Sequence, residues 1–303
     1  MIFISLPTWQ HQKDYSWHNR FGAFIFLTGN KYVDKFVITE ATYMHSGKSK
    51  KLIFDINKFS KFKDKIIYIV VDEQPQDLFQ INDYDNLETK SSKKIMNAKK
   101  REVYQVQKTR EGFVNALPDD IIIISDLDEI PNLENIDFKK INQKLIFFKQ
   151  KMYYYKLNLF YKLIPWYGSK ACKKKFFISP EWLRSTKNKK YPIWRPDIIF
   201  SRKKYNDIYF VLDGGWHFTN IRKPEDLEKK LLNFLHHVDF EHSKIRLQDL
   251  KKLMDEKKVM YKHTFDKREN KWGQGETLLT TDIKDMPKYI IENLDKYKPW
   301  LDS

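Results

Sequence analysis

The sequence predicts an α/β fold with a mostly parallel central sheet and a helical C-terminal cover. Short apolar runs alternate with segments of helical periodicity, which is typical of α/β folds. The four consecutive isoleucines at 121–124 fit a strand of a parallel sheet that is covered on both faces. With 303 residues the chain is long enough to bury a sizeable core. We therefore predict one α/β domain over residues 1–222, with a helical region over residues 223–303 packed on it as part of the same unit.

The predicted elements of the first half follow from local patterns. KFVITEA (35–41) and KIIYIVVD (65–72) are predicted buried strands, and each has an acidic residue at or near its end. Apolar residues recur at roughly helical spacing over residues 91–117, and Pro118 ends this helix because proline has no backbone N–H. IIIIS (121–125) is the third predicted strand.

The second half contains longer aromatic segments. Residues 144–161 predict one long strand or two paired strands, and residues 162–200 predict a loop. Residues 208–219 predict another strand, which ends in a glycine pair followed by tryptophan and histidine. Pro224 begins a predicted helix whose first turn is acidic and so complements the helix dipole. The apolar face predicted for this helix comprises Leu227, Leu231, Phe234 and Leu235.

The composition excludes several classes of protein. Hydrophobic residues make up 41% of the chain and aromatic residues 16%, so a disordered chain is not expected. No apolar run approaches the roughly 20 residues of a membrane span. The opening residues do not combine a basic segment with an apolar one, so we expect no signal peptide. Cys172 is the single cysteine, which excludes an internal disulfide framework and fits a reducing compartment.

The net charge of +16, carried mostly by lysine, has two interpretations. It favours an acidic partner such as nucleic acid, anionic lipid or the phosphates of a small ligand. Alternatively, the lysines are spread over solvated faces, because no stripe rich in arginine or interleaved with aromatic residues is evident. The basic runs are short and scattered: KSKK (48–51), KKK (173–175) and KNKK (187–190).

The segment IIIISDLDEIP (121–131) carries three carboxylates directly after an apolar strand. Ligands bind beyond the carboxyl ends of the strands in parallel α/β sheets, and Asp126, Asp128 and Glu129 lie there. Carboxylates so concentrated repel one another unless a cation lies between them, and Mg²⁺ or Mn²⁺ accepts such ligands together with phosphate oxygens. The segment therefore predicts a metal and nucleotide site, or else a turn that an aspartate caps.

His217 follows Gly214, Gly215 and Trp216 at the end of a predicted strand. Glycines allow the backbone to approach a ligand closely, and a neutral imidazole can complete the ligand set of Mn²⁺. His217 is accordingly predicted as a third metal ligand, or else as a packed core histidine. Asp213 is predicted as the general base that activates an acceptor hydroxyl, or else as a turn residue.

Several blocks of the chain together resemble glycosyltransferase family 17, which includes the β-1,4-mannosyl-glycoprotein N-acetylglucosaminyltransferase that adds bisecting GlcNAc. The blocks PDDIIIISDLDEIP (118–131) and GGWHFT with the following Lys-rich helix (214–236) are the most specific. FVITEATYMHSGKSKKLIF (36–54), YYYKLN with WYGSKA (153–171) and the C-terminal MPKYIIENLDKYKPWL continue the match. The resemblance extends from about residue 33 to about residue 300.

The resemblance implies a GT-A-type fold that binds a sugar nucleotide through a D-x-D motif and a divalent metal. The family reaction is the inverting transfer of GlcNAc from UDP-GlcNAc. Carried over by position, Asp126 and Asp128 form the D-x-D pair, Asp126, Asp128 and His217 bind Mn²⁺ or Mg²⁺, and Asp213 and Glu129 are catalytic candidates. The residues expected to contact the UDP-sugar are Glu40, Asp126, Asp128, Trp166, Gly168, Lys170, Gly215 and Trp216.

We expect the partners to be a UDP-sugar donor and a glycan acceptor, with no nucleic acid, no membrane span and at most peripheral membrane contact. The Golgi anchor of eukaryotic members is absent, so we expect a bacterial or viral enzyme that acts in the cytoplasm. Two alternatives remain open: a basic nucleic-acid-binding protein or metal-dependent nuclease, and an inactive member of the fold that serves as a binding module. The segment before residue 33 and Val106 depart from the family pattern.

Overall fold

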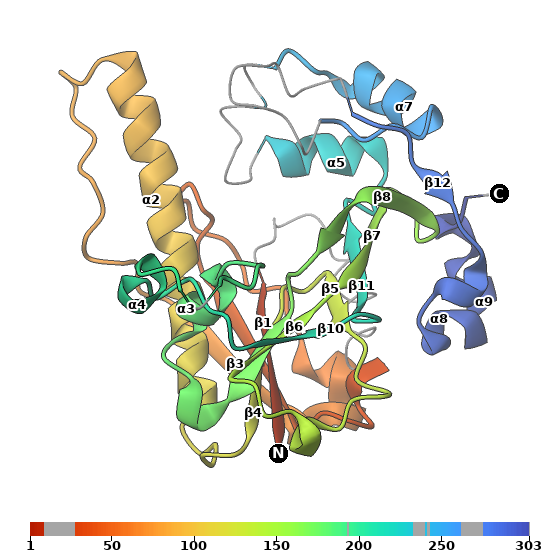
Figure 1. The fold of residues 1–303 in the computed structure, drawn as a ribbon. Helices are drawn as coiled ribbons and strands as arrows, with labels where there is room; N and C mark the ends of the chain where they lie inside the picture. Colours follow the sequence, from red (N-terminus) through yellow and green to blue (C-terminus); the bar gives the residue numbers. More distant parts are fainter. Residues whose placement is uncertain (9–27, 193, 233–239, 241–242, 262–274, 303) are drawn as a thin grey trace.

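The apolar strands of the first third lie side by side in a seven-stranded sheet. The computed structural model describes residues 1–8, 28–192, 194–232, 240, 243–261 and 275–302, which form a mixed α/β structure with two sheets and several helices (Figure 1). The strand order of the larger sheet is β10-β6-β9-β4-β1-β2-β3. Its strands are β1 (Ile2–Thr8), β2 (Lys35–Ala41), β3 (Ile66–Val71), β4 (Ile121–Ile124), β6 (Leu145–Phe148), β9 (Lys170–Lys173) and β10 (Ile208–Val211).

Four neighbouring strands of this sheet run in the same direction. β1 pairs in parallel with both β2 and β4, and β2 pairs in parallel with β3. β9 is antiparallel to β4 and to β6, whereas β10 is parallel to β6. The register places Ser5 beside Ile124 and Thr8 beside Glu40, so the carboxyl ends of β1, β2 and β4 meet at one edge.

A second sheet of five strands adjoins the first. Its order is β12-β8-β7-β11-β5. The strands are β5 (Glu129–Pro131), β7 (Gln150–Tyr154), β8 (Leu159–Trp166), β11 (Gly215–Thr219) and β12 (Leu279–Thr280). Between the described strands β4 and β11, the chain passes from one sheet to the other at five places: residues 125–128, residues 132–144, Lys149, residues 167–169 and residues 212–214. The acidic DLD segment is one of these crossovers.

The predicted strand at 208–219 is therefore two strands, β10 and β11, that belong to different sheets. The glycine pair makes this crossing possible. A Cβ on Gly214 would lie 2.4 Å from the backbone nitrogen of Lys149. Gly215 has φ +109°, and its Cβ would lie 2.1 Å from the carbonyl oxygen of Ile130. The glycines thus allow close approach between backbone segments, and their predicted approach to a ligand stays a prediction.

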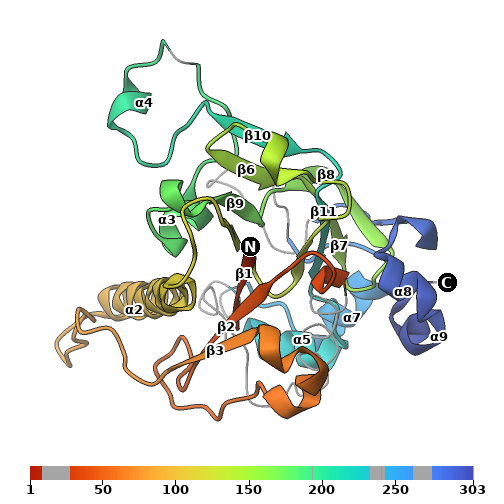
Figure 2. The same cartoon turned by 90° about the horizontal axis from the view of Figure 1, so that it is seen from below.

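Helices cover both sheets. α2 and the following 3₁₀ helix η2 contact β2 and β3, while α3 contacts β4 and β9, so these helices line one face of the larger sheet (Figures 1 and 2). α5 and α7 pack on the smaller sheet through a separate apolar cluster. The α-helices are α2 (Leu87–Lys108), α3 (Pro180–Ser185), α4 (Asp197–Phe200), α5 (Pro224–Leu231), α7 (Leu247–Asp255), α8 (Lys288–Glu292) and α9 (Leu294–Tyr297). The 3₁₀ helices are η1 (Ile56–Lys65), η2 (Thr109–Phe113), η3 (Phe138–Lys140), η4 (Lys174–Phe176), η5 (Ile283–Asp285) and η6 (Lys298–Trp300).

The long helix differs from its prediction at both ends. α2 begins four residues before Ser91, because the side chain of Asn86 accepts the N–H of Thr89 and caps the helix. The regular helix ends at Lys108, and Val114 and Leu117 are 74% and 63% exposed instead of lining an apolar face. The buried side of α2 is largely polar and comprises Asn97, Ala98, Glu102, Gln105 and Val106.

Other local predictions are confirmed or corrected. The strands expected at 35–41, 65–72 and 121–125 are present within one residue at each end. The segment 162–200, predicted as a loop, contains the end of β8 together with β9, α3 and α4. The helix after Pro224 is present and buries Leu227 and Leu231, while Phe234 and Leu235 lie outside the described residues.

The boundary predicted at residue 222 stays a prediction. In the described part of 223–303, helices predominate and β12 adds a two-residue strand to the smaller sheet. None of the helices in the described ranges combines the length and the hydrophobicity that crossing a bilayer requires.

Candidate active site

The DLD crossover is fixed by hydrogen bonds to both sheets. The backbone N–H of Ser125 donates to the carbonyl of Ser5 on β1 over 3.2 Å, and the Ser125 hydroxyl donates to the carbonyl of Glu129 over 2.9 Å. From the other side, the N–H of Phe218 on β11 donates to the carbonyl of Asp128 over 2.8 Å. Because the backbone is held on both sides, the carboxylates of this segment are presented from a rigid support.

Asp126 is oriented by an arginine that the sequence did not single out. Nη2 of Arg184, in α3, lies 3.0 Å from Oδ2 of Asp126, and Nη1 of the same side chain lies 2.8 Å from Oε1 of Glu102. The two neighbouring carboxylates raise the pKa of Arg184 above its usual value despite burial. The buried Oδ1 of Asp126 has no hydrogen-bond partner in the described part of the chain. One oxygen of Asp126 is therefore engaged by protein and the other is available to a ligand.

Asp128 faces His217 across a short gap. Oδ2 of Asp128 lies 3.7 Å from Nε2 of His217, and the indole of Trp166 stacks on the imidazole with ring centroids 4.4 Å apart. Burial opposes charge on both groups, but Asp128 raises the pKa of His217 above its ordinary value and His217 lowers the pKa of Asp128. The Nδ1 atom of His217 is buried without a partner among the described residues. A carboxylate oxygen and an imidazole nitrogen thus face the same small space.

Glu129 lies beneath this pair and is almost fully buried, with 3% of its surface exposed. Its Oε1 accepts the indole N–H of Trp166 over 2.6 Å, and its Oε2 accepts the backbone N–H of Asp126 over 2.8 Å. Burial, with the nearby carboxylate of Asp126, raises the pKa of Glu129 to about 7. A Cβ on Gly168 would lie 1.7 Å from Oε1 of Glu129, so only glycine fits there. Glu129 positions the DLD backbone and the Trp166 ring.

Lys230, from the helix after β11, lies close enough to Asp128 for their charges to interact, and Arg222 neighbours Lys230. Nζ of Lys230 donates to Oδ1 of Asn220 over 2.9 Å. Burial and the neighbouring guanidinium of Arg222 lower the pKa of Lys230 to about 8, and Asp128 acts in the opposite direction. Arg222 itself is 5% exposed. Neither residue was predicted from the sequence as a site residue, although both lie inside the block 214–236 that carries the family resemblance.

Two residues predicted to bind the UDP-sugar have structural contacts instead. Glu40 is 1% exposed and forms an ion pair of 2.7 Å with the buried Lys50. It also accepts the hydroxyl of Tyr68 and two backbone N–H groups of the 50–54 loop. Nζ of Lys170 donates to the carbonyl oxygens of Arg184 and Thr186 over 2.8 Å and 2.6 Å. Through these contacts, Glu40 fixes the 50–54 loop and Lys170 fixes the end of α3.

Two further predicted residues lie away from the carboxylate cluster. The indole N–H of Trp216 donates to the carbonyl of Asp285 in η5 over 2.6 Å. Since consecutive residues of a strand point to opposite faces, Trp216 lies on the other side of β11 from His217. Asp213 is exposed in the crossover before β11, where Oδ2 accepts the side-chain amide of Asn132 over 3.2 Å. The structure therefore brings together Asp126, Asp128, Glu129, Trp166, Gly168 and His217 from the predicted set.

The predicted three-ligand metal set of Asp126, Asp128 and His217 stays a prediction. Within the described residues, no group of three or more His, Cys, Asp or Glu side chains is arranged to hold a metal ion. The Oδ2 oxygen of Asp126 is engaged by Arg184. Asp128 and His217 remain as a facing pair of suitable donors, so any ion held here would need ligands from the substrate as well.

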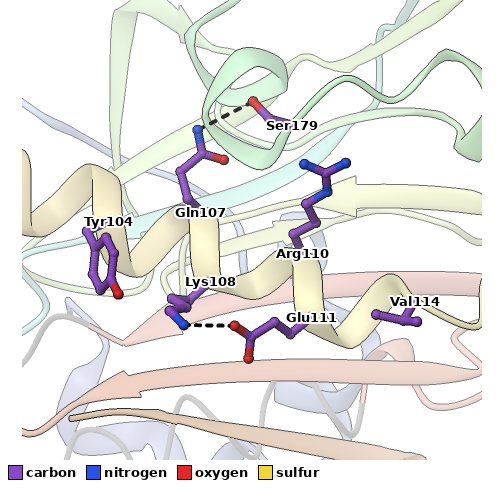
Figure 3. A pocket seen from close by; sticks show the side chains of 7 residues that line it. All are labelled: Tyr104, Gln107, Lys108, Arg110, Glu111, Val114 and Ser179. Atoms are coloured by element: carbon purple, nitrogen blue, oxygen red, sulfur yellow. Dashed lines mark hydrogen bonds and ion pairs between the residues drawn. The ribbon is translucent and has the colours of Figure 1, made fainter. Parts of the chain in front are cut away.

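Two pockets lie elsewhere on the surface. One of about 520 Å³ is bounded by α2, η2 and Ser179, and Figure 3 shows Arg110 and the Lys108–Glu111 ion pair at its wall. Another, of about 790 Å³, lies at the amino ends of β1 and β4, opposite the DLD edge, and includes Asp119 and Asp120. Neither pocket is lined by a residue of the carboxylate cluster.

Comparison with known proteins supports one family. A search of curated protein sequences found no match. A model of the family described as "Glycosyltransferase family 17" matches residues 28–302, which is nearly the whole chain and includes the DLD crossover, Trp166, Arg184, His217 and Lys230. The chain therefore belongs to glycosyltransferase family 17 and is a glycosyltransferase, with a sugar donor and a glycan acceptor as its substrates.

Proposed function

We propose that this glycosyltransferase has a GT-A-type fold and transfers GlcNAc from UDP-GlcNAc to a glycan hydroxyl with inversion, in a metal-dependent reaction. The observation that carries this proposal is the DLD crossover at the carboxyl edge of parallel strands, where Asp128 faces His217 and the buried Oδ1 oxygen of Asp126 has no partner among the described residues. Family membership favours glycosyl transfer over the nuclease hypothesis.

The position of this segment supports the GT-A assignment. Ligands of open α/β sheets bind beyond the carboxyl ends of the strands. β3, β2, β1 and β4 are consecutive parallel neighbours, and the DLD segment follows the last of them before the chain enters the smaller sheet. The motif thus occupies the end of a parallel strand, which is where a nucleotide diphosphate would be bound.

The donor atoms present fit a divalent ion that also binds phosphate. Asp128 and His217 would hold it, since a carboxylate oxygen and an imidazole nitrogen together suit Mn²⁺ better than Mg²⁺. When bound, such an ion neutralises the negative charge that develops on the departing diphosphate. Trp166 fixes the plane of the imidazole by stacking, and Arg184 keeps one oxygen of Asp126 in place while the other faces the ligand.

The remaining charges suggest how the chain assists departure of UDP and attack by the acceptor. Lys230 lies close enough to Asp128 for their charges to interact, and Arg222 neighbours Lys230, so we assign both cations to the leaving diphosphate. Asp213 stays the proposed base, although it is exposed in the crossover before β11 and lies outside the carboxylate cluster. It takes the proton of the acceptor hydroxyl while that oxygen bonds to the anomeric carbon and UDP leaves from the opposite face.

A donor screen tests this function. The protein is incubated with UDP-, GDP- and CMP-sugars plus Mn²⁺, with and without glycan acceptors, and the released nucleotide is measured. We expect release of UDP from UDP-GlcNAc above that from the other donors, and loss of release when a chelator removes the metal. Faster nucleotide release from a GDP- or CMP-sugar than from UDP-GlcNAc would contradict the donor assignment. Full activity in the presence of a chelator would contradict the metal requirement.

A further inference from the structure

The segment between α3 and β10 projects from the body of the protein as a closed excursion. We define the basic excursion as the described residues 187–192 and 194–205. Its two limbs are joined where the N–H of Lys187 donates to the carbonyl of Lys203 over 2.8 Å and the N–H of Tyr191 donates to the carbonyl of Tyr205 over 3.0 Å. α4 lies near its tip, away from both sheets (Figure 2). These backbone bonds give the excursion a defined base.

Two large aromatic side chains of the basic excursion are exposed to water. Trp194 is 81% exposed and Phe200 is 86% exposed. A single exposed apolar side chain needs no explanation, but two aromatic rings on one projecting segment form an apolar tip whose exposure to water is unfavourable. The tip is therefore suited to insert into an apolar environment that a binding partner provides.

The charge of the basic excursion restricts the kinds of partner that it can bind. The segment contains seven Lys or Arg residues and one acidic residue, Asp197. Arg195 and Lys204 both form ion pairs with Asp197, so this carboxylate is already neutralised. The exposed basic side chains are Lys187, Lys189, Lys190, Arg202 and Lys203. Exposed cations on the same projecting segment as two exposed aromatic rings complement a surface that is anionic outside and apolar beneath.

We propose that the basic excursion docks the protein on an anionic lipid bilayer, with Trp194 and Phe200 entering the interface between headgroups and acyl chains. Tryptophan and phenylalanine favour this depth, and each Lys or Arg near an anionic leaflet adds attraction. A single-stranded nucleic acid would need rings arranged along a basic groove. The exposure of Trp194 and Phe200 places them on a projection instead, which favours the bilayer.

The connections of the basic excursion relate docking to the candidate site. The excursion begins directly after α3, which carries Arg184 and its ion pair with Asp126. It ends at β10, whose chain continues through Asp213 into β11 and His217. A bilayer bound at the tip would hold the candidate site at a fixed position relative to membrane-borne acceptors. Docking itself does not depend on the proposed function and is tested without any sugar nucleotide.

Flotation with lipid vesicles tests the proposal. The full chain is mixed with vesicles of phosphatidylcholine containing about one third phosphatidylglycerol, or with vesicles of phosphatidylcholine alone. We expect the wild type to float with the anionic vesicles only, and to be released as salt is raised. Trp194→Ser combined with Phe200→Ser should reduce the bound fraction roughly tenfold or more. Lys189→Glu combined with Lys203→Glu should also abolish binding.

Matched variants exclude general effects of lost hydrophobicity or charge. Tyr84 and Leu87 are 86% and 88% exposed near the start of α2, so Tyr84→Ser with Leu87→Ser should float as the wild type does. Thermal melting verifies that each variant is folded. The proposal is overturned if the wild type fails to float, or if the Trp194 and Phe200 variant floats unchanged. Binding to a single-stranded oligonucleotide without binding to vesicles would also overturn it and would favour a nucleic acid partner.

Discussion

Asp128→Asn is expected to lower the release of UDP from UDP-GlcNAc by roughly 10²- to 10³-fold, while the protein stays folded. The substitution keeps the shape of the side chain and the backbone carbonyl that accepts the N–H of Phe218. It removes the negative charge that faces His217 at 3.7 Å and that would hold a divalent ion beside the diphosphate. Nucleotide release at saturating donor, measured beside the melting temperature, gives the result.

Asp119→Asn is the matched control for this prediction. Asp119 is an exposed carboxylate at the opposite edge of the larger sheet, where it pairs with Lys175. The same change of one charge at this distant position should leave nucleotide release unchanged. If Asp128→Asn retains wild-type turnover and Asp119→Asn does too, the DLD segment is a structural turn and the proposed site is wrong.

Arg184→Met is expected to lower the free energy of unfolding by about 3 kcal/mol at neutral pH. The guanidinium bridges Glu102 and Asp126, whose side chains are 9% and 25% exposed, so its removal leaves two carboxylates without their main counter-charge. Asp126 would also lose the contact that orients it, and nucleotide release should fall together with stability. Urea unfolding of wild type and variant measures the difference.

The stability difference should depend on pH. Burial would raise the pKa of Glu102, but Arg184 and Lys99 lower it below its ordinary value of 4.5. A carboxylate whose pKa is lowered on folding stabilises the protein at pH values above its pKa in the unfolded state. That stabilisation is lost as the pH falls through its pKa in the folded state. The difference in the free energy of unfolding between wild type and Arg184→Met should therefore be largest near neutral pH and should decrease in acid.

Lys99→Met provides the control for the arginine. Lys99 contacts the same Glu102 carboxylate from the solvent side, with 45% of its side chain exposed, so its loss should cost less than about 1 kcal/mol. Arg184→Lys should recover only part of the stability, because lysine cannot bridge two carboxylates with a planar fork. Equal effects of Arg184→Met and Lys99→Met would contradict the bridging function.

The strands and the DLD segment could be predicted because their signals are local. Apolar runs identified β2, β3 and β4 to within one residue. Burial on both faces explains the apolar composition of β2 and β4, whereas β3 lies at the edge of the sheet and is only partly buried. The sequence placed Asp128 and His217 in one predicted site, and the structure brings them face to face, although His217 lies within β11 of the smaller sheet and not at a strand end. These inferences needed only the hydrophobic periodicity, the positions of the strand ends and the family resemblance.

The parts that could not be predicted depend on contacts between distant residues. Arg184 meets Asp126 across 58 positions, and nothing in the short helix PEWLRS distinguishes this arginine from a solvated one. On the buried side of α2, Glu102 accepts from Arg184 and Gln105 donates to the carbonyl of Thr39. Because this buried side is largely polar, the apolar pattern predicted the wrong ends for the helix. The division of 208–219 between two sheets required knowing which backbone lies beside Gly214.

Calorimetric titration of the wild type with UDP, in Mn²⁺ and again in chelator, tests the central claim most directly. The claim is that the DLD crossover binds a nucleotide diphosphate together with a divalent ion. We predict saturable binding in Mn²⁺, strong weakening in chelator, and the same weakening in Asp128→Asn with the metal present. Binding of UDP that neither chelator nor Asp128→Asn changes, or no binding at all, would contradict it.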